Sequence, residues 1–273
     1  GAQPGVQLGI YQTTLTLDPC SDWRIVVAEQ NRDESIANFQ DPELTNVHVE
    51  AWLNNSDGDC NNSPALSVIN LPYVCVASPL FYNLGFVDPD GDSLVYSLVP
   101  ALASITPLTP FEMTYAGTYT GEEPIDGMTI DPVTGQIEVT PNLLGKFNAV
   151  VEVEEFRNGT RIGVVRYDFL FLVNVCGTPP PSPVINSFEN ISGGAYPLSE
   201  NTIGICANDD FCFTLDFISV DPNENVELTS NIDAIIPGAT TTQTGTNPAT
   251  MQFCGTIPPG FSGGQFLITA LDD

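Results

Sequence analysis

The sequence is poor in basic residues. Among its 273 residues are 34 acidic and 6 basic side chains, with Lys146 the lone lysine, and the formal net charge is -28. A surface with so few cations cannot replace the counterions of nucleic acid or of anionic lipid headgroups, so neither is expected as a partner. The same surface attracts divalent cations or a basic partner and keeps a long polymer in solution. An adaptation to solubility or salt is the alternative reason for the bulk charge.

Histidine is also scarce, and the seven cysteines form no Cys-x-x-Cys pair. His48 is the lone histidine, so a zinc site built from Cys and His is not expected. A Ser–His–Asp or Cys–His catalytic arrangement would have to use His48, which lies in the alternating, strand-like segment Val47–Glu50. Nothing selects a carboxylate pair for glycoside hydrolysis. The sequence therefore predicts a protein that is not an enzyme.

Long apolar runs and helix signals are both missing. No run approaches the ~20 residues of a membrane-spanning helix, so we expect no direct membrane insertion. Short runs rich in Val, Ile, Thr, Phe and Tyr, most of them alternating in polarity, are separated by 23 Pro and 23 Gly. This pattern predicts an all-β protein built from tandem β-sandwich modules, with Gly163–Val175 central and buried on both faces. The expected strands are Gln7–Leu17, Val47–Leu53, Leu94–Val99, Gln136–Val139, Asn148–Val153, Gly163–Val175, Phe211–Phe217 and Gln265–Leu271.

Two breaks divide the chain. Asn54–Pro64 is polar and turn-forming, and Thr178–Pro183 is a Pro-rich, stiff spacer that cannot join the interior of a sheet. They predict a partial N-terminal β module (residues 1–60), a central sandwich (61–177) and a C-terminal sandwich that is truncated at its end (178–273). The start Gly1–Gly5 lacks the features of a signal peptide, and both ends are expected to be cuts from a longer chain.

The cysteines favour disulfides formed in an oxidising, extracellular compartment. Two cysteines flank the central strands, two lie in apolar strand-like runs of the C-terminal part, and two are the remaining local choice. In that order, the expected pairs are Cys75–Cys176, Cys212–Cys254 and Cys20–Cys60. Cys206 is left over, and its partner is expected just beyond residue 273. Sequence alone leaves this connectivity open.

Several short motifs along the chain carry a resemblance when they are taken together. In the central part they are Asn62-Ser63-Pro64, Cys75, Val87–Leu98, Gly127–Ile137 and Val153–Gly159. Asp18–Trp23 and Arg32–Asn38 precede them, and Cys212-Phe213, Asp221-Pro222, Pro237–Thr240 and Leu271–Asp273 follow. Together these motifs resemble repeats of giant Bacteroidota surface adhesins that are exported by the type IX secretion system, the gliding-motility adhesins among them. The Asp88–Asp92 and Ile130–Ile137 segments are similar to cadherin-like and immunoglobulin-like bacterial modules.

The resemblance implies more than the fold. It implies immunoglobulin-like or cadherin-like modules on the cell surface that extend an attachment or gliding-motility adhesin, with neighbouring repeats of the same chain as contacts. Surface glycans or other cell-surface proteins are the outside partners it suggests. Relatives often have two adjacent cysteines where this chain has Gln30-Asn31, so the disulfide pattern that those cysteines form in relatives is not expected here. A Cys-Pro often follows an ending such as Leu271–Asp273 in relatives, which implies a partner for Cys206.

Asp88, Asp90 and Asp92 form the best candidate site. Carboxylates at alternate positions of a turn forced by Pro and Gly can direct several hard oxygens at one Ca²⁺. The distal bidentate Glu of an EF-hand is missing, so the remaining ligands would come from Glu154, Glu155 or backbone carbonyls. A solvated turn between strands is the equal alternative.

Two further features concern sugars. Asp92-Ser93-Leu94 resembles the O-glycosylation motif of Bacteroidota, which makes Ser93 a candidate attachment site. Tyr115, Tyr119 and Phe111 lie in the long segment Thr106–Thr120, where they either mark a carbohydrate-binding face or pack over the sandwich edge. The alternative function is an accessory spacer or carbohydrate-binding module of a secreted polysaccharide-degrading enzyme.

Overall fold

The computed structural model describes residues 9–66, 72–106, 109–178, 181–183, 188–199, 202–261 and 263–272. It contains 49% strand and 3% helix, which confirms a mostly β chain. The expectations for residues 1–8 and for Asp273 lie outside the described residues. The elements before the Pro-rich spacer are β1 (Trp23–Glu29), a 3-10 turn at Pro42–Leu44, β2 (Asn46–Leu53), β3 (Ala65–Leu66), β4 (Tyr73–Cys75), β5 (Leu80–Asn83), β6 (Phe86–Val87), β7 (Ser93–Leu98), β8 (Leu102–Ser104), β9 (Pro110–Glu112), β10 (Thr129–Ile130), β11 (Gln136–Val139), β12 (Gly145–Arg157) and β13 (Thr160–Asn174).

One large sheet organises this part of the chain. Its strand order is β7-β12-β13-β2-β8-β9, with β1 also pairing with β2 and β4 also pairing with β13. The β12–β13 hairpin turns at Asn158-Gly159, where both residues adopt positive φ angles (52° and 78°) as a tight hairpin turn requires. β13 lies between β12 and β2, as its long apolar sequence predicts, but the burial expected on both faces is incomplete, since most residues from Val164 to Leu172 are half-buried. The other pairs of this sheet are antiparallel, but β4 runs parallel to the end of β13.

The two faces of β12 enter different cores. Phe147, Ala149, Val151 and Val153 point into the larger core, which they share with Ile137 of the three-stranded β10-β11-β5 sheet. The two sheets therefore form a sandwich-like pair of layers around this core. Val150 points to the opposite face, into a smaller core. The middle of β12, from Phe147 to Val151, is buried on both faces for this reason.

The N-terminal part does not form a sheet of its own, contrary to the boundary expected at residue 60. β2 pairs with β13 (Leu53 with Gly163) and with β8 (Val47 with Ala103), so residues 23–53 complete the large sheet. Ile36 and Phe39 share the smaller core with Val150. Asn54–Pro64 is thus a connection within one folded unit, since a turn-forming composition marks a loop and not a domain border.

The first expected strand is also wrong in its described part. Residues 9–17 form no strand, and Ile10, Tyr11 and Leu15 are exposed. The first strand among the described residues is Trp23–Glu29, which the sequence did not single out. Alternation alone does not make a strand, because a strand also needs a partner and a core face to bury.

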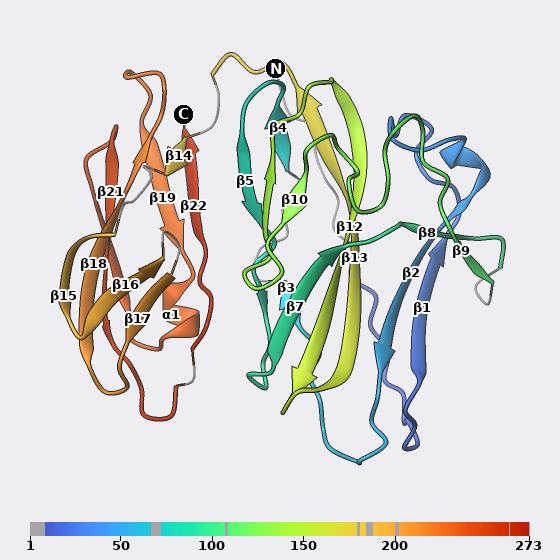
Figure 1. Ribbon diagram of the computed structural model, residues 1–273, viewed down its shortest axis with the longest axis horizontal. Coiled ribbons are helices and arrows are strands. Elements are labelled where there is room, and N and C mark those ends of the chain that lie inside the picture. Colours follow the sequence, from blue (N-terminus) through green and yellow to red (C-terminus); the bar gives the residue numbers. More distant parts are fainter. Residues whose placement is uncertain are drawn as a thin grey trace.

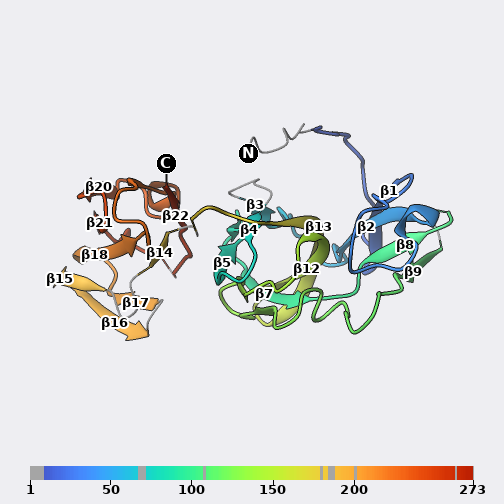
Figure 2. The same cartoon turned by 90° about the horizontal axis from the view of Figure 1, so that it is seen from above.

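The C-terminal part is a second β unit beside the first (Figures 1 and 2). Its strand orders are β14-β18-β21-β20 with β15 on β18, then β16-β17 and β19-β22. A core of phenylalanine, isoleucine and valine side chains fills it, centred on Phe211, Phe213 and Phe253. Its elements are β14 (Ser182–Pro183), β15 (Glu189–Gly193), β16 (Ala195–Ser199), β17 (Thr202–Ile205), β18 (Asp210–Ile218), β19 (Val226–Ser230), α1 (Ile232–Ile235), β20 (Thr240–Thr244), β21 (Ala249–Thr256) and β22 (Ile268–Asp272).

Two disulfides form as the sequence predicts. Cys75 and Cys176, with Cα atoms 5.3 Å apart, join β4 to the segment just after β13. Cys212 and Cys254 face each other across β18 and β21, with Cα atoms 4.2 Å apart. These bonds indicate an oxidising, extracytoplasmic setting.

The third expected pair is wrong, because Cys20 and Cys60 are both free thiols. The backbone N–H of Cys20 donates to the Asn55 side chain (2.8 Å), while the carbonyl of Cys60 accepts from Arg157 (2.9 Å). Each cysteine is thus held by a different partner. Cys206 is also free and exposed, and its partner beyond residue 273 stays a prediction. No helix among the described residues is long and apolar enough to span a membrane.

Candidate metal centre

The Asp88 side chain organises the turn between β6 and β7. Its Oδ1 atom accepts hydrogen bonds from the backbone N–H groups of Asp90 (2.9 Å) and Asp92 (3.0 Å). Gly91 adopts φ 79°, a left-handed conformation that glycine tolerates without strain. Because Oδ1 is engaged in the turn, the other oxygen is left to face inward. Asp88 Oδ2 is buried and has no hydrogen-bond partner.

Glu155 reaches the same place from β12. It is fully buried and follows the phase of the core residues Val151 and Val153, whereas Glu154 lies on the opposite face and pairs with Arg161 (2.6 Å). Glu155 lies opposite Gly163 on β13, next to an irregularity in the pairing. A Cβ atom at Gly163 would lie 2.3 Å from Glu155 Oε2. The glycine therefore leaves the room that the carboxylate occupies.

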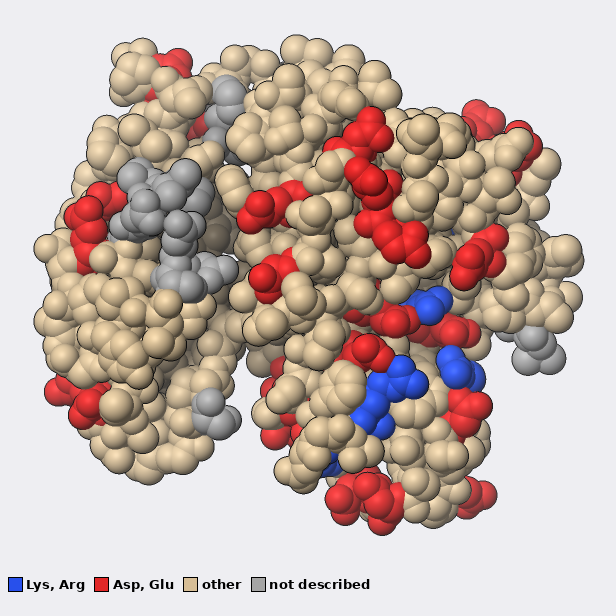
Figure 3. Space-filling model, viewed as in Figure 1, with Lys and Arg blue, Asp and Glu red and all other residues tan. Residues whose placement is uncertain are grey.

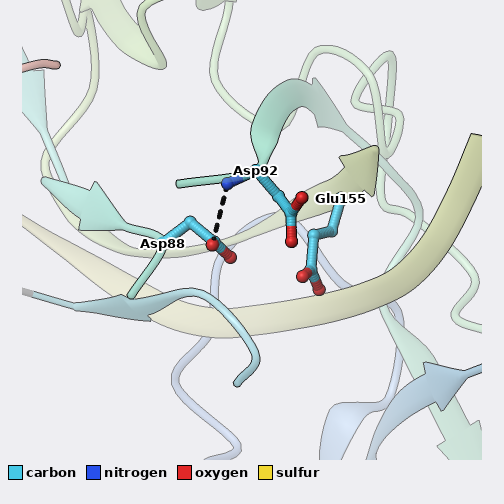
Figure 4. A group of neighbouring side chains, drawn as sticks. All are labelled: Asp88, Asp92 and Glu155. Carbon is cyan, nitrogen blue, oxygen red and sulfur yellow. Dashed lines mark hydrogen bonds between the residues drawn. The ribbon is translucent and has the colours of Figure 1, made fainter. Parts of the chain in front are cut away.

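Asp88, Asp92 and Glu155 form one compact carboxylate cluster (Figure 4). One oxygen from each of them lies within 4.8 Å of the others. Asn61 donates to Glu155 Oε2 (3.0 Å), but Glu155 Oε1 is buried without a partner, like Asp88 Oδ2. Two buried carboxylate oxygens without donors are costly, and a hard cation bound between them would supply what the protein does not.

Asp90, one of the three residues predicted as ligands, lies outside this cluster. Its carboxylate accepts hydrogen bonds from the Asn62 backbone N–H (2.6 Å) and the Asn62 side chain (2.8 Å), and these bonds lower its pKa. Glu155 takes its place. The alternating pattern Val151-x-Val153-x-Glu155 could have selected Glu155 over Glu154, because residues two apart on a strand share a face.

Arg157 closes the outer side of the cluster. Its Nε and Nη2 atoms donate to the Asp92 carboxylate, and Nη2 also reaches Asp90 (3.3 Å). Nη1 donates to the carbonyl of Cys60. Arg157 therefore neutralises Asp92 and fixes the 60–62 loop over the site, which leaves Glu155 and Asp88 as the carboxylates of the cluster without a cation.

The electrostatics of Glu155 follow from this arrangement. The pKa of Glu155 is raised to about 7, mainly because burial disfavours its charged form; the charges of Asp88 and Asp92 act in the same direction, and the hydrogen bond from Asn61 opposes them. A divalent cation would reverse this balance, since it favours the ionised form of every carboxylate around it. The site can thus hold either a proton or a metal ion at Glu155.

The other residues considered from the sequence have structural surroundings. His48 is buried in β2, and its Nε2 atom lies 3.4 Å from Glu50 Oε2. Tyr115 packs against Phe39 with ring centroids 5.1 Å apart, and Tyr119 packs against Phe147. These two rings therefore pack onto the fold, whereas Phe111, the third aromatic residue of that segment, is exposed. Ser93 begins β7 with an exposed side chain, which is open to modification.

A buried ion pair was not anticipated from the sequence. Arg32 Nη2 donates to Asp168 Oδ2 at 2.7 Å, and the exposed fractions of the two side chains are 2% and 8%. Asn148 also donates to Asp168. The signal was present, since Asp168 interrupts the apolar run of β13 and a carboxylate there needs a cation.

No family model matches this chain, and no curated protein sequence matches it.

Proposed function

We propose that this chain is a non-catalytic, tension-bearing part of an extracellular surface protein, made of immunoglobulin-like or cadherin-like modules. The observation that carries the proposal is the disulfide between Cys75 and Cys176, which closes a loop with a sequence separation of 101. A pull on the two ends of the chain passes directly across this bond. The strands from β5 to β13 lie inside the loop, so tension does not extend them.

The second disulfide acts in the same way in the C-terminal unit. Cys212 and Cys254 lie on adjacent, paired strands and enclose a loop with a sequence separation of 42. Each unit therefore has one covalent bond that limits how far force can lengthen it. A secreted protein that only had to stay folded would gain stability from such bonds too, but here both loops enclose the central strands of their units.

The proposed cation is Ca²⁺, held by Asp88, Asp92 and Glu155. Calcium takes carboxylate oxygens readily and tolerates irregular geometry. The ion would tie the turn before β7 to β12, two elements that also pair in the large sheet. Its contribution would be mechanical: it neutralises carboxylates that otherwise repel each other.

The resemblance to type IX-secreted adhesins gives this role its setting. An attachment or gliding-motility adhesin needs a long, soluble and load-bearing stalk outside the cell, and tandem β units with an excess of acidic residues suit that need. Its contacts would be the neighbouring repeats of the same chain and, at the tip, a surface glycan or another cell-surface protein.

Stretching single molecules by their two ends tests the proposal. With ~3.5 Å per extended residue, the disulfides should hide about 350 Å and 150 Å of contour length. Oxidised chains should release about 500 Å less than reduced chains and should open at higher force. Without reductant, the variant Cys75→Ala/Cys176→Ala should release the roughly 350 Å of its loop but not the roughly 150 Å of the other loop. Cys206→Ala, which removes a free cysteine, is the matched control and should release neither. Equal opening forces with and without reductant would contradict a tension-bearing role.

A further inference from the structure

An open groove crosses the large sheet on the side of the smaller core. Its cavity volume is about 210 Å³, and its lining includes Arg24, Glu50, Trp52, Glu152, Arg161 and Arg166. These residues come from β1, β2, β12 and β13, far apart in the sequence. None of them belongs to the carboxylate cluster of Asp88.

The strand register explains why they meet. Trp52 of β2 lies opposite Arg24 of β1 and opposite Val164 of β13. Arg166 of β13 lies opposite Glu152 of β12. Side chains opposite each other on neighbouring strands share a face. The groove therefore has a floor of Trp52 and Val164 with charged side chains on either side.

Only part of this sheet face is covered. Further along β12 and β13, Val150 and Leu170 are covered by Ile36, Phe39 and Met113 of the smaller core. The groove begins where that cover ends. A half-covered face with one tryptophan in the open part presents an apolar surface to a ligand without exposing a large patch.

The charge of the groove is unusual for this chain. Three of its six basic residues line it, although the chain has 34 acidic residues. Figure 3 shows the basic residues of the visible face gathered in one region, while the acidic residues are spread widely. The field of the whole molecule repels anions, so an anion site has to be built locally from such a cluster.

The three arginines of the groove have N–H groups that make no hydrogen bond to the described protein. Among the described residues, Arg166 donates only from Nε, to Glu152 (2.8 Å), and Arg161 only from Nη1, to Glu154 (2.6 Å). Arg24 donates from Nε and Nη1 to Asp22 and Glu50. Each of the three therefore has at least one Nη atom without a protein acceptor. Arg161 also lies 4.9 Å over the Trp52 ring, which holds its guanidinium in place.

The arginines with a structural role differ. Arg32 engages both Nη atoms on Asp168 and the carbonyl of Leu102. Arg157 engages all three of its nitrogens on the loop and turn around Asp92. Apart from Arg32 Nε, which is buried without a partner, the unused guanidinium donors of the described residues lie at the groove.

We propose that this groove binds a carboxylated saccharide unit, such as a uronic acid residue of a polysaccharide. The free guanidinium nitrogens offer paired donors to a planar carboxylate. Glu50 and Glu152 accept hydrogen bonds from sugar hydroxyls, which an acidic peptide would largely lack. Trp52 and Val164 pack against the apolar face of the ring.

Calorimetric titration of the oxidised chain at low salt tests the proposal with trigalacturonate as the probe. Trigalacturonate should bind at least tenfold more tightly than neutral galactotriose. Arg166→Gln and Trp52→Ala should each weaken binding at least tenfold. Lys146→Gln, which removes one positive charge outside the groove, should leave it within about twofold. Unchanged β-sheet circular dichroism would show that the variants are folded.

Three results would overturn the proposal. The first is absence of trigalacturonate binding at millimolar concentration. The second is equal binding of sodium sulfate, which would show a simple anion site. The third is tighter binding of triglutamate, which would assign the groove to an acidic protein segment. The proposal does not rest on the disulfides, so the stretching and binding experiments can fail independently.

Discussion

The two units of the chain, which lie before and after the Pro-rich spacer Thr178–Pro183, stabilise their carboxylates in different ways. All six basic residues lie before residue 167, whereas the part from residue 178 onward has eleven acidic residues and no basic one. In the first unit, arginines bury carboxylates: Arg32 holds Asp168, and Arg157 holds Asp92. In the second unit, hydroxyls serve instead, as Thr250 donates to Asp216 and Thr256 to Asp210, both at 2.6 Å.

The difference shows what cations are needed for. A hydroxyl satisfies a carboxylate at the surface, but a carboxylate inside a sheet needs a cation, because burial of an unpaired charge is costly. The first unit places Arg32 and Arg157 against carboxylates that are largely buried, and leaves the buried carboxylate of Glu155, with Asp88 beside it, without a cation. That exception is the candidate metal centre.

The largest expected effect concerns the disulfides, of which each unit contains one. Removing a disulfide raises the conformational entropy of the unfolded chain. The free energy of unfolding should therefore fall by about 4.7 kcal/mol without the Cys75–Cys176 bond and by about 4 kcal/mol without the Cys212–Cys254 bond, which closes a shorter loop. We expect Cys75→Ala/Cys176→Ala to destabilise the first unit more than Cys212→Ala/Cys254→Ala destabilises the second. Chemical unfolding followed by hydrogen exchange measures each unit. The reverse order would contradict this expectation.

The next largest effect distinguishes the units. Arg32→Met leaves Asp168 buried without a cation and should cost the first unit about 3–5 kcal/mol. Because Arg32 joins the N-terminal part to β13, this loss should appear in one cooperative transition of residues 23–174. Arg24→Met, at a half-exposed arginine, is the control and should cost under about 1 kcal/mol. Separate melting of the N-terminal strands would contradict the single unit.

The third prediction concerns pH in the absence of metal. Glu155 has its pKa raised from 4.5 to about 7 in the folded state by burial and by Asp88 and Asp92, with Asn61 and Arg157 the other groups around it. The folded state therefore favours its protonated form. The stability of the first unit should be highest below about pH 4.5 as far as Glu155 is concerned, and should fall by about 3 kcal/mol as the pH rises to 7.

Urea unfolding in chelator at pH 5 and pH 7.5 measures most of this fall, because about 1 kcal/mol of it occurs below pH 5. Glu155→Gln should abolish it. Asp33, whose pKa is lowered to about 2 by its bond to Lys146, and Asp90 act in the opposite sense, but only at more acidic pH. A first unit equally stable at both pH values would show that Glu155 titrates normally.

The smallest effect belongs to the second unit. Its acidic residues have no basic residue in the same unit to offset them, so salt should relieve their mutual repulsion. Raising NaCl from 0.05 to 0.5 M should slow hydrogen exchange in β18 and β21 by up to about fivefold, equal to about 1 kcal/mol. The ion pairs of the first unit should weaken slightly instead. An equal response of both units would show that local pairing has no part in the difference.

Much of the fold could be predicted from the sequence because it depends on local pattern. β2, β7, β11, β13 and the β18 strand follow runs of alternating or continuous apolar residues, and two disulfides followed from cysteines placed at strand ends or within strands. The N-terminal boundary could not be predicted, since the pairing of β2 with β13 joins residues more than a hundred positions apart. Nothing local in Asn54–Pro64 distinguishes a loop within a sheet from a border between modules.

The candidate site was predicted in the same partial way. The turn Asp88–Asp92 is local and its spacing revealed it, but the choice between Asp90 and Glu155 depended on tertiary contacts. Asp90 accepts hydrogen bonds from Asn62 and lies outside the cluster. The Glu155 side chain has room in the cluster because Gly163 on the next strand has no side chain. A sequence shows which residues carry carboxylates, while packing decides which of them converge.

Calorimetric titration of the metal-free chain with Ca²⁺ at pH 7.5 tests the central claim, that the first unit contains a metal centre built from Asp88, Asp92 and Glu155. We expect one ion bound per chain. Binding should be lost in Glu155→Gln and in Asp88→Asn, and the affinity should stay within about threefold in the matched variant Asp90→Asn. Absence of binding heat, or binding that survives Glu155→Gln but not Asp90→Asn, would contradict it.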